Sequence, residues 1–158
     1  MNCPAKPLRV LVADDDRTVL NLLCRMLTRL GYEVTGCRDG VEALDGFKKR
    51  IFHLVLTDLQ MPRMDGWELV RQIKALSPHL PVIALTGQCP EDIQAHLPDS
   101  GFDHILYKPF DIGKLNAAAK RALKSVSPPR PQRLAHSPVK APSSLTLMER
   151  SPLPIELA

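Results

Sequence analysis

Aromatic side chains are scarce in this chain of 158 residues, at 4%, although hydrophobic residues reach 44%. The core that such a composition can build must therefore be aliphatic. Long apolar runs are also missing, because no stretch approaches the roughly 18 consecutive apolar residues that a membrane helix needs. The beginning, MNCPAKPLR, has no apolar segment of the kind found in secretory signals. We therefore expect no membrane span and a cytoplasmic protein.

Cysteine patterns that indicate a metal site or a disulfide framework are absent as well. The four cysteines form no CxxC pair, and no histidine spacing matches a zinc site. This favours scattered, reduced thiols. The charge is mildly positive, with 21 basic and 17 acidic residues and a net charge of +4. That balance does not predict the clustered basic face of a nucleic-acid-binding domain.

Short apolar runs alternate with helical patterns along most of the chain. The runs predict buried strands of a parallel sheet at 8–13, 33–37, 53–57, 81–85 and 104–107. Helical spacing of apolar residues and capping signals predict five helices, which begin near Asp16, after Asp39, near Trp67, at Pro90 and near Asp111. Such alternation predicts an α/β fold in which helices cover both faces of a doubly wound parallel sheet.

The fourth predicted helix is short. Pro90 suits its first turn, where the missing N–H costs nothing, and Pro98 should end it. Gly46 lies inside the second predicted helix, where glycine costs about 1 kcal/mol relative to alanine. The second and fourth helices are therefore the weakest parts of the predicted fold.

The composition changes at residue 125. The segment 125–158 contains seven of the 15 prolines and no aromatic residue, which predicts disorder. We therefore divide the chain into an extension at 1–7, a domain at 8–124 and a Pro-rich tail at 125–158. The tail is too short to fold as a DNA-binding effector domain, so we expect none.

Polar residues stand where the predicted strands end. Asp14 and Asp15 follow the first strand, Asp58 the third, Thr86 the fourth and Lys108 the fifth. In an open parallel sheet, ligands bind outside the carboxyl ends of the strands. We therefore expect these five side chains to meet at one edge of the sheet.

The chemistry of these side chains indicates a phosphoryl acceptor. Three carboxylates at one edge repel one another unless a cation lies between them, and Mg²⁺ is a hard cation that prefers such oxygen ligands. With Lys108 and Thr86 beside it, the Asp58 carboxylate is suited to form an acyl phosphate. The metal and the lysine would offset the charge on the transferring group.

Four motifs carry a resemblance to a known family: LVADD (11–15), LVLTDLQMPRMDG (54–66), IALTG (83–87) and YKPF (107–110). From about Leu8 to Leu123 the chain resembles a response-regulator receiver domain of two-component signalling. The resemblance implies a flavodoxin-like fold with five helices and a five-stranded parallel sheet of order 2-1-3-4-5. It also implies a cis peptide bond between Lys108 and Pro109, a state found essentially at proline.

The resemblance also implies a role for each site residue. Asp58 is the phosphoacceptor; Asp14 and Asp15 bind Mg²⁺ together with Asp58 and the main-chain carbonyl of Gln60; Thr86 is the switch hydroxyl; and Lys108 contacts the phosphoryl group. The implied phosphodonor is a histidine kinase or a histidine phosphotransfer protein. The implied output is contact with a protein partner. No enzyme activity is implied beyond self-phosphorylation and self-dephosphorylation on Asp58.

Three further positions bear on the switch and on the lifetime of the phosphoryl group. Ile105 stands where the family usually has the aromatic switch residue, three residues before Lys108, so the switch position has neither ring nor hydroxyl. Gln60 and Gln88 follow Asp58 and Thr86 by two residues each and should flank the phosphoryl group. They are candidates for tuning its lifetime, because an amide could orient a hydrolytic water or block it.

Two other functions fit parts of the pattern. A haloacid-dehalogenase-like phosphatase also uses an aspartate nucleophile and Mg²⁺, and Asp14 and Asp16 have its two-residue spacing. The context of Asp58 argues against that enzyme. The other alternative is a receiver that acts only as a phosphate sink or as an unphosphorylated scaffold.

Overall fold

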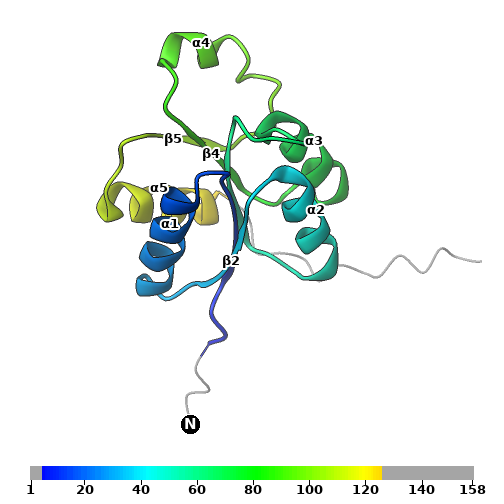
Figure 1. Ribbon diagram of the computed structural model, residues 1–158. Coiled ribbons are helices and arrows are strands. Elements are labelled where there is room, and N and C mark those ends of the chain that lie inside the picture. The colour runs from blue at the N-terminus through cyan, green and yellow to red at the C-terminus, as the bar shows by residue number, and fades with distance from the viewer. Residues whose placement is uncertain (1–4, 126–158) are drawn as a thin grey trace, which may run out of the picture. The chain divides into compact units, whose positions relative to one another are not determined.

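Five parallel strands form the centre of the molecule in this computed structural model, which describes residues 5–125. Their order in the sheet is β2-β1-β3-β4-β5, as the family resemblance implies (Figure 1). The prediction of a disordered tail lies outside the described residues. The strands are β1 (Arg9–Ala13), β2 (Glu33–Cys37), β3 (Leu54–Asp58), β4 (Val82–Thr86) and β5 (His104–Tyr107).

Five helices alternate with the strands, which confirms the predicted α/β fold. Helices α1 and α5 cover one face of the sheet, and α2 and α3 cover the other (Figure 1). None of the helices between residues 5 and 125 is both long and apolar enough to cross a membrane. The helices are α1 (Arg17–Arg29), α2 (Gly40–Lys49), α3 (Gly66–Leu76), α4 (Pro90–Gln94) and α5 (Ile112–Lys124).

The core is aliphatic, as the composition requires. Successive residues of β1 point to opposite faces, so Val10 and Val12 pack towards α1 and α5, while Leu11 and Ala13 pack towards α2 and α3. All four are completely buried. Phe52 is the single aromatic side chain among the buried hydrophobic residues described.

Aspartates begin four of the five helices. Each accepts a hydrogen bond from a main-chain N–H of the first turn, and such caps stabilise a helix by about 1 kcal/mol each. Three of these starts, at Asp16, Asp39 and Asp111, are predicted from the sequence and confirmed. The four caps are Asp16, Asp39, Asp65 and Asp111.

Strand and helix ends differ from the sequence prediction by a few residues, and three of these differences concern α4 and the polar residues of the site. Helix α4 ends at Gln94 rather than at Pro98, because the N–H of His96 bonds the carbonyl of Ile93 in a tighter turn. Asp58 and Thr86 are the last residues of β3 and β4 rather than the residues after them. Their backbones are therefore held by the sheet.

The three cysteines within residues 5–125 are free thiols: Cys24, Cys37 and Cys89. Burial raises the pKa of Cys37 to about 12, and the charges of Glu42 and Asp39 add to this effect. Its thiol is therefore protonated at neutral pH and is a poor nucleophile. Among the described cysteines, the expectation of thiols without a disulfide framework is confirmed.

The register of the strands brings their carboxyl ends to one edge. Ala13 lies beside Thr57, Asp58 beside Leu85, and Thr86 beside Tyr107. The residues that follow β1 and β5, Asp14 and Lys108, consequently emerge next to Asp58 and Thr86. The fold itself assembles the site that the sequence predicts.

Candidate functional site

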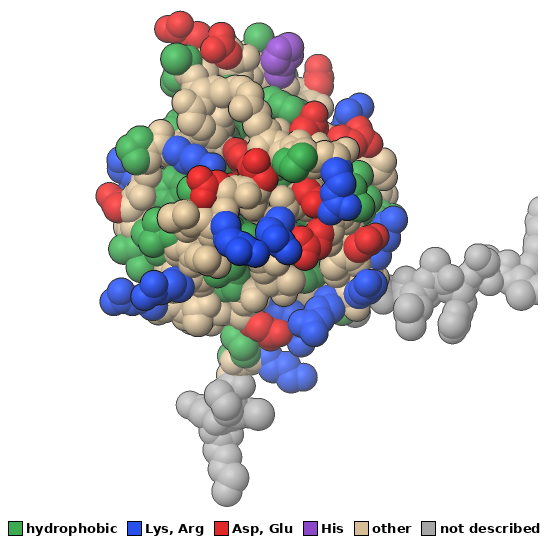
Figure 2. Space-filling view, in the orientation of Figure 1, with side chains coloured by type: hydrophobic (Ala, Val, Ile, Leu, Met, Phe, Trp, Pro, Cys, Tyr) green, Lys and Arg blue, Asp and Glu red, His purple; other side chains and the backbone are tan. Residues whose placement is uncertain are grey.

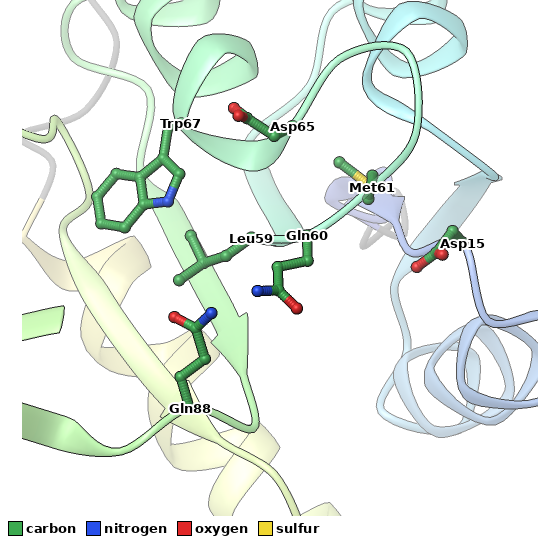
Figure 3. Close-up of a pocket in the computed structure, with 7 residues that line it drawn as sticks. All are labelled: Asp15, Leu59, Gln60, Met61, Asp65, Trp67 and Gln88. Atoms are coloured by element: carbon green, nitrogen blue, oxygen red, sulfur yellow. The ribbon is translucent and has the colours of Figure 1, made fainter. Parts of the chain in front are cut away.

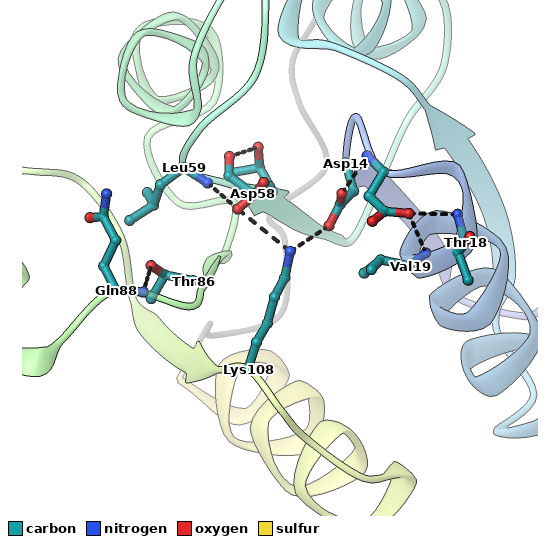
Figure 4. A network of polar contacts seen from close by, with 10 residues as sticks. Asp14, Thr18, Val19, Asp58, Leu59, Thr86, Gln88 and Lys108 are labelled. Carbon is teal, nitrogen blue, oxygen red and sulfur yellow. Dashed lines mark hydrogen bonds and ion pairs between the residues drawn. The ribbon is translucent and has the colours of Figure 1, made fainter.

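Asp14 is completely buried, yet both of its carboxylate oxygens are paired (Figure 4). Oδ1 accepts a hydrogen bond of 2.9 Å from the main-chain N–H of Asp16, and Oδ2 accepts one of 2.9 Å from Nζ of Lys108. Its own N–H donates to the carbonyl of Cys37 at 3.1 Å, which fixes the backbone to the end of β2. A buried carboxylate held in this way has a defined orientation before any ligand binds.

Asp58 is half-buried at the end of β3. Its Oδ1 accepts a 2.9 Å hydrogen bond from the N–H of Leu59 and lies 3.7 Å from Nζ of Lys108. Burial raises the pKa of the Asp58 carboxyl; the Lys108 ammonium opposes this, while the negative charges of Asp14 and Asp15 add to it. The environment therefore disfavours the charge on Asp58 in the absence of a further cation.

Lys108 is the cation that joins two of these carboxylates. Burial alone would lower the pKa of its ammonium, but the hydrogen bond to Asp14 and the charge of Asp58 raise it overall. Lys108 therefore stays charged, and Figure 4 shows its side chain between Asp14 and Asp58. One ammonium leaves the cluster of three carboxylates with an excess of negative charge.

The three aspartates fit a divalent cation. One carboxylate oxygen each from Asp14, Asp15 and Asp58 lies within 4.8 Å of the other two. This donor set consists only of oxygens, and the negative charge that Lys108 leaves unbalanced suits a hard ion such as Mg²⁺. Gln60, whose carbonyl the resemblance adds as a ligand, begins the loop after β3 and lines the same hollow as Asp15.

Thr86 lies at the end of β4 with 1% of its surface exposed. Its Oγ1 accepts a 3.0 Å hydrogen bond from the N–H of Gln88, and its carbonyl accepts one of 2.7 Å from the N–H of Lys108. The peptide bond between Lys108 and Pro109 is cis, as the resemblance implies. Thr86 thus connects the end of β4 both to Lys108 and to the turn that leads into α4.

An open hollow of about 540 Å³ lies beside the carboxylates. The side-chain amides of Gln60 and Gln88 face each other across it (Figure 3). Asp15 and Trp67 lie on its wall. Both candidates for tuning the phosphoryl lifetime therefore border the same space.

Ile105 lies apart from the polar residues, in an apolar cluster between the sheet and α4. It is half-buried and packs with Leu59, Ala84 and Ile93. Sequence reasoning missed an aromatic member of this cluster, Trp67, although it directly follows the DG that ends the motif at 54–66. The Trp67 ring makes an edge contact with Phe102 at a centroid distance of 5.3 Å. Aromatic rings therefore belong to the same cluster as Ile105, but they come from other positions.

Acidic and basic side chains are interspersed over the face seen in Figure 2. The acidic groups at the centre of that view lie near the edge of the sheet where β1 and β3 end. On this face, the view agrees with the mild charge balance of the sequence.

Mg²⁺ is expected to stabilise the protein against unfolding. A cation that binds only the folded state at ten times its dissociation constant adds about 1.4 kcal/mol to the free energy of unfolding. Thermal unfolding should therefore shift upwards with Mg²⁺ in the wild type and much less in Asp15→Asn. Asp45→Asn, which changes an exposed aspartate of α2, is the matched control. Equal shifts in all three proteins would contradict a cation site at Asp15.

Comparisons with a family model and with the sequences of known proteins agree with each other. The family model described as "Response regulator receiver domain" matches residues 10–120. The response regulator MprA of Mycobacterium sp. (strain KMS) is 39% identical over 122 residues, which is 77% of this chain and 53% of MprA. The transcriptional regulatory protein ZraR of Klebsiella oxytoca is 35% identical over 130 residues, covering 82% of this chain and 28% of ZraR. The chain thus spans about half or less of these relatives.

Solved structures share the fold. The chemotaxis protein CheY4 of Vibrio cholerae superimposes with a TM-score of 0.69 at 32% identity, covering 74% of this chain and 99% of CheY4. The receiver domain of a sensor histidine kinase from Pseudomonas aeruginosa PAO1 gives a TM-score of 0.69 at 27% identity, covering 75% and 98% of the two chains. That structure is described as having a magnesium ion coordinated in its active-site cleft.

Proposed function

This chain belongs to the response regulator receiver domain family, and from that premise we propose that Asp58 accepts a phosphoryl group from a histidine kinase or a histidine phosphotransfer protein. The observation that supports this assignment best is the position of Lys108. Its Nζ lies 2.9 Å from Asp14 and 3.7 Å from Asp58, at the edge where all five polar residues converge. We propose Asp14, Asp15, Asp58 and the carbonyl of Gln60 as ligands of Mg²⁺.

The transfer forms one bond and breaks one bond. An oxygen of the Asp58 carboxylate attacks phosphorus, and the bond from phosphorus to the imidazole nitrogen of the donor breaks, leaving the electron pair on that nitrogen. Lys108 carries the positive charge that balances the oxygens of the transferring group. A bound Mg²⁺ would add electrostatic stabilisation of the same charge. With a proton on the other ring nitrogen of the donor imidazole, the leaving group is a neutral histidine, and the other product is an aspartyl phosphate.

Thr86 offers a route from the site to α4. Its hydroxyl oxygen holds the N–H of Gln88 in the turn before α4. Rotation of this hydroxyl towards a phosphoryl group on Asp58 would release that N–H and loosen the turn. Phosphorylation would then change the populations of two conformations of the α4 segment. A protein partner that binds one of these conformations more tightly would respond to the change. We propose such a protein contact as the output, with Ile105, which pairs with Ala84 of β4, in the place of an aromatic ring.

Acetyl phosphate tests the function directly. The protein should gain the mass of one phosphoryl group in the presence of Mg²⁺ and lose this labelling when the metal is chelated. No labelling, under conditions that label a known receiver domain, would overturn the proposal.

A haloacid-dehalogenase-like phosphatase would instead turn over a phosphate ester, and this turnover would disappear in Asp14→Asn but not in Asp58→Asn. A phosphate sink would be labelled without a change in partner binding, and an unphosphorylated scaffold would bind its partner without labelling.

Gln60 and Gln88 should slow the loss of the phosphoryl group. Their amides face each other across the hollow that Asp15 also lines (Figure 3). In this position they would restrict the approach of water to a phosphoryl group on Asp58. Gln60→Ala and Gln88→Ala are therefore expected to speed decay of the aspartyl phosphate by about three- to tenfold, a barrier change on the order of 1 kcal/mol. Decay is measured by mass after removal of the phosphodonor. Gln72→Ala, on the exposed side of α3, is the control; decay unchanged in both test variants would contradict the assignment.

A further inference from the structure

Arg63 has a backbone conformation that non-glycine residues rarely adopt. Its φ is +65°, and it is the only non-glycine residue with positive φ between residues 5 and 125. The N–H of Met64 donates to the carbonyl of Pro62 at 2.8 Å, two residues apart. Such a bond around a residue with positive φ is the arrangement of a classic γ-turn, which is rare and strained. Other contacts must hold the loop in this shape.

Asp39 provides the contact that holds Arg63. The Nε of Arg63 donates to Oδ2 of Asp39 at 3.0 Å, and Nη2 contacts the same oxygen. Oδ1 of Asp39 accepts the N–H of Glu42 at 2.9 Å and so caps α2. Although burial acts to raise the pKa of Asp39, the hydrogen bond from Glu42 and the interaction with Arg63 lower it overall. One charged carboxylate thus begins α2 and fixes the loop after β3.

The same loop is packed closely against its surroundings at two other points. The N–H of Gly40 donates to the carbonyl of Met64 at 3.2 Å, and a Cβ on Gly40 would lie 2.5 Å from that oxygen. At the end of the loop, the N–H of Gly66 donates to the carbonyl of Leu59 at 3.0 Å. The loop is therefore supported by α2 on one side and by the end of β3 on the other.

Gln60 belongs to this loop, and Asp15 lines one hollow with Gln60 and another with Arg63. Gln60 and Asp15 line the hollow of about 540 Å³. Arg63, Asp39 and Asp15 line a second hollow of about 490 Å³. Figure 3 shows the loop running out from Gln60 and Met61 and returning to Asp65. The ion pair of Arg63 thus fixes the far part of the segment that carries the Gln60 carbonyl.

We propose that Arg63 is a positioning residue of the divalent-cation site: its ion pair with Asp39 holds the loop so that the main-chain carbonyl of Gln60 faces the carboxylates. This inference rests on the cation site of the proposed function. It assigns the guanidinium no contact with the metal or with the phosphoryl group. Its effect reaches the site through the loop backbone.

Three substitutions of Arg63 distinguish an effect on Mg²⁺ affinity from an effect on the stability of the fold. Arg63→Gly removes the guanidinium and also relieves the strain at positive φ, so the free energy of unfolding should stay equal or rise. Mg²⁺ affinity should nevertheless fall by about three- to tenfold, at or below the low end of effects seen when residues that support metal ligands are removed. Arg63→Ala should lose both affinity and stability. Arg63→Lys keeps the positive charge but lacks the planar guanidinium group. Its Mg²⁺ affinity should lie between those of Arg63→Gly and the wild type.

Substitution of Asp39 tests the pair from the other side. Asp39→Asn keeps an oxygen that can accept the N–H of Glu42 and cap α2, but it removes the charge that holds Arg63. It should weaken Mg²⁺ binding about as much as Arg63→Gly does. The double variant should be no weaker than either single variant, because both changes break the same interaction.

The measurement is Mg²⁺ titration of the protein without any phosphodonor. Trp67 is the only tryptophan and lines the hollow with Gln60, so its fluorescence can report binding, with calorimetry as a second readout. Arg71→Ala, which removes an exposed arginine of α3, is the matched control and should bind normally. Hydrogen exchange at the Met64 amide should speed up in Arg63→Gly.

The outcomes distinguish this inference from the proposed function. Normal Mg²⁺ affinity in both Arg63→Gly and Asp39→Asn would overturn the positioning role while leaving the cation site intact. A loss of affinity that only follows a loss of folding free energy would also overturn it. Failure of the wild type to bind Mg²⁺ would overturn the proposed cation site and this inference together.

Discussion

Asp58→Asn is expected to abolish phosphoryl uptake from acetyl phosphate and, at the same time, to raise the free energy of unfolding. Asparagine has nearly the same shape as aspartate, but its amide is not a nucleophile that can form an acyl phosphate. If Asp58 is the phosphoacceptor, no other group at this edge replaces it. Intact mass measurement after incubation with acetyl phosphate and Mg²⁺ reports the first effect.

The gain in stability follows from the electrostatics of the site. Burial and the neighbouring carboxylates raise the pKa of Asp58, so its charge destabilises the folded state more than the unfolded chain. A neutral amide removes this cost, and the gain should be on the order of 1 kcal/mol in the absence of metal. Urea denaturation of both proteins without Mg²⁺ measures it.

The pH dependence of that gain has a definite sign. A carboxyl with a raised pKa binds its proton more tightly in the folded state, so its contribution to stability rises as the pH falls towards the ordinary aspartate pKa of about 4. The difference between wild type and Asp58→Asn should therefore be largest near neutral pH and shrink on acidification.

Asp45→Asn is the control for both effects, because Asp45 is exposed on α2. It should be labelled like the wild type and unfold with nearly the same free energy. Labelling of Asp58→Asn at the level of the wild type would show that the acceptor lies elsewhere. A loss of stability in Asp58→Asn would mean that its hydrogen bond from Leu59 outweighs the relief of repulsion.

The fold and the edge of the sheet could be predicted because both are encoded by short patterns. An apolar run followed at once by Asp14 or Lys108 specifies a buried strand and a polar end. Parallel pairing then brings such ends together regardless of their separation in sequence. The same logic gave the strand order only with the help of the family resemblance, since the crossovers alone permit more than one arrangement.

The Asp39–Arg63 pair could not be predicted in this way. Asp39 looked like an ordinary helix start, and Arg63 like one more polar residue of a breaker-rich loop. Neither the positive φ of Arg63 nor the second use of the Asp39 carboxylate is visible in sequence spacing. Both arise from the way the loop after β3 folds back on α2, which is a tertiary contact.

The α4 region shows a different limit. Pro90 and Pro98 marked the region correctly as a short helix, but a proline only bounds a helix and does not fix its last residue. The helix stops at Gln94, where a tighter turn takes over. For Ile105, the sequence shows that an aliphatic residue replaces the usual aromatic one. That Ile105 shares a cluster with Trp67 and Phe102 could be learned only from the structure, because these residues are far apart in the sequence.

Replacement of two glycines by alanine is expected to change stability in opposite directions. A Cβ on Gly66 would lie 2.2 Å from the carbonyl oxygen of Asp58, a contact that no side-chain rotation can relieve. Alanine is favoured over glycine in a helix by about 1 kcal/mol, but overpacking against backbone costs about 1–3 kcal/mol and displaces atoms. Gly66→Ala should therefore lower the free energy of unfolding, by up to about 2 kcal/mol.

Gly46 in α2 is the matched control, because a Cβ there meets only Cys37 Sγ and Leu11 Cδ1, at 4.0 Å each. Gly46→Ala should raise the free energy of unfolding by about 0.5–1 kcal/mol, since alanine favours the helix and restricts the unfolded chain. Urea denaturation measures both changes. Because the clash at Gly66 is with the backbone of Asp58, Gly66→Ala should also slow labelling by acetyl phosphate, whereas Gly46→Ala should not. Equal stability of the two variants would contradict the close packing of α3 against the end of β3.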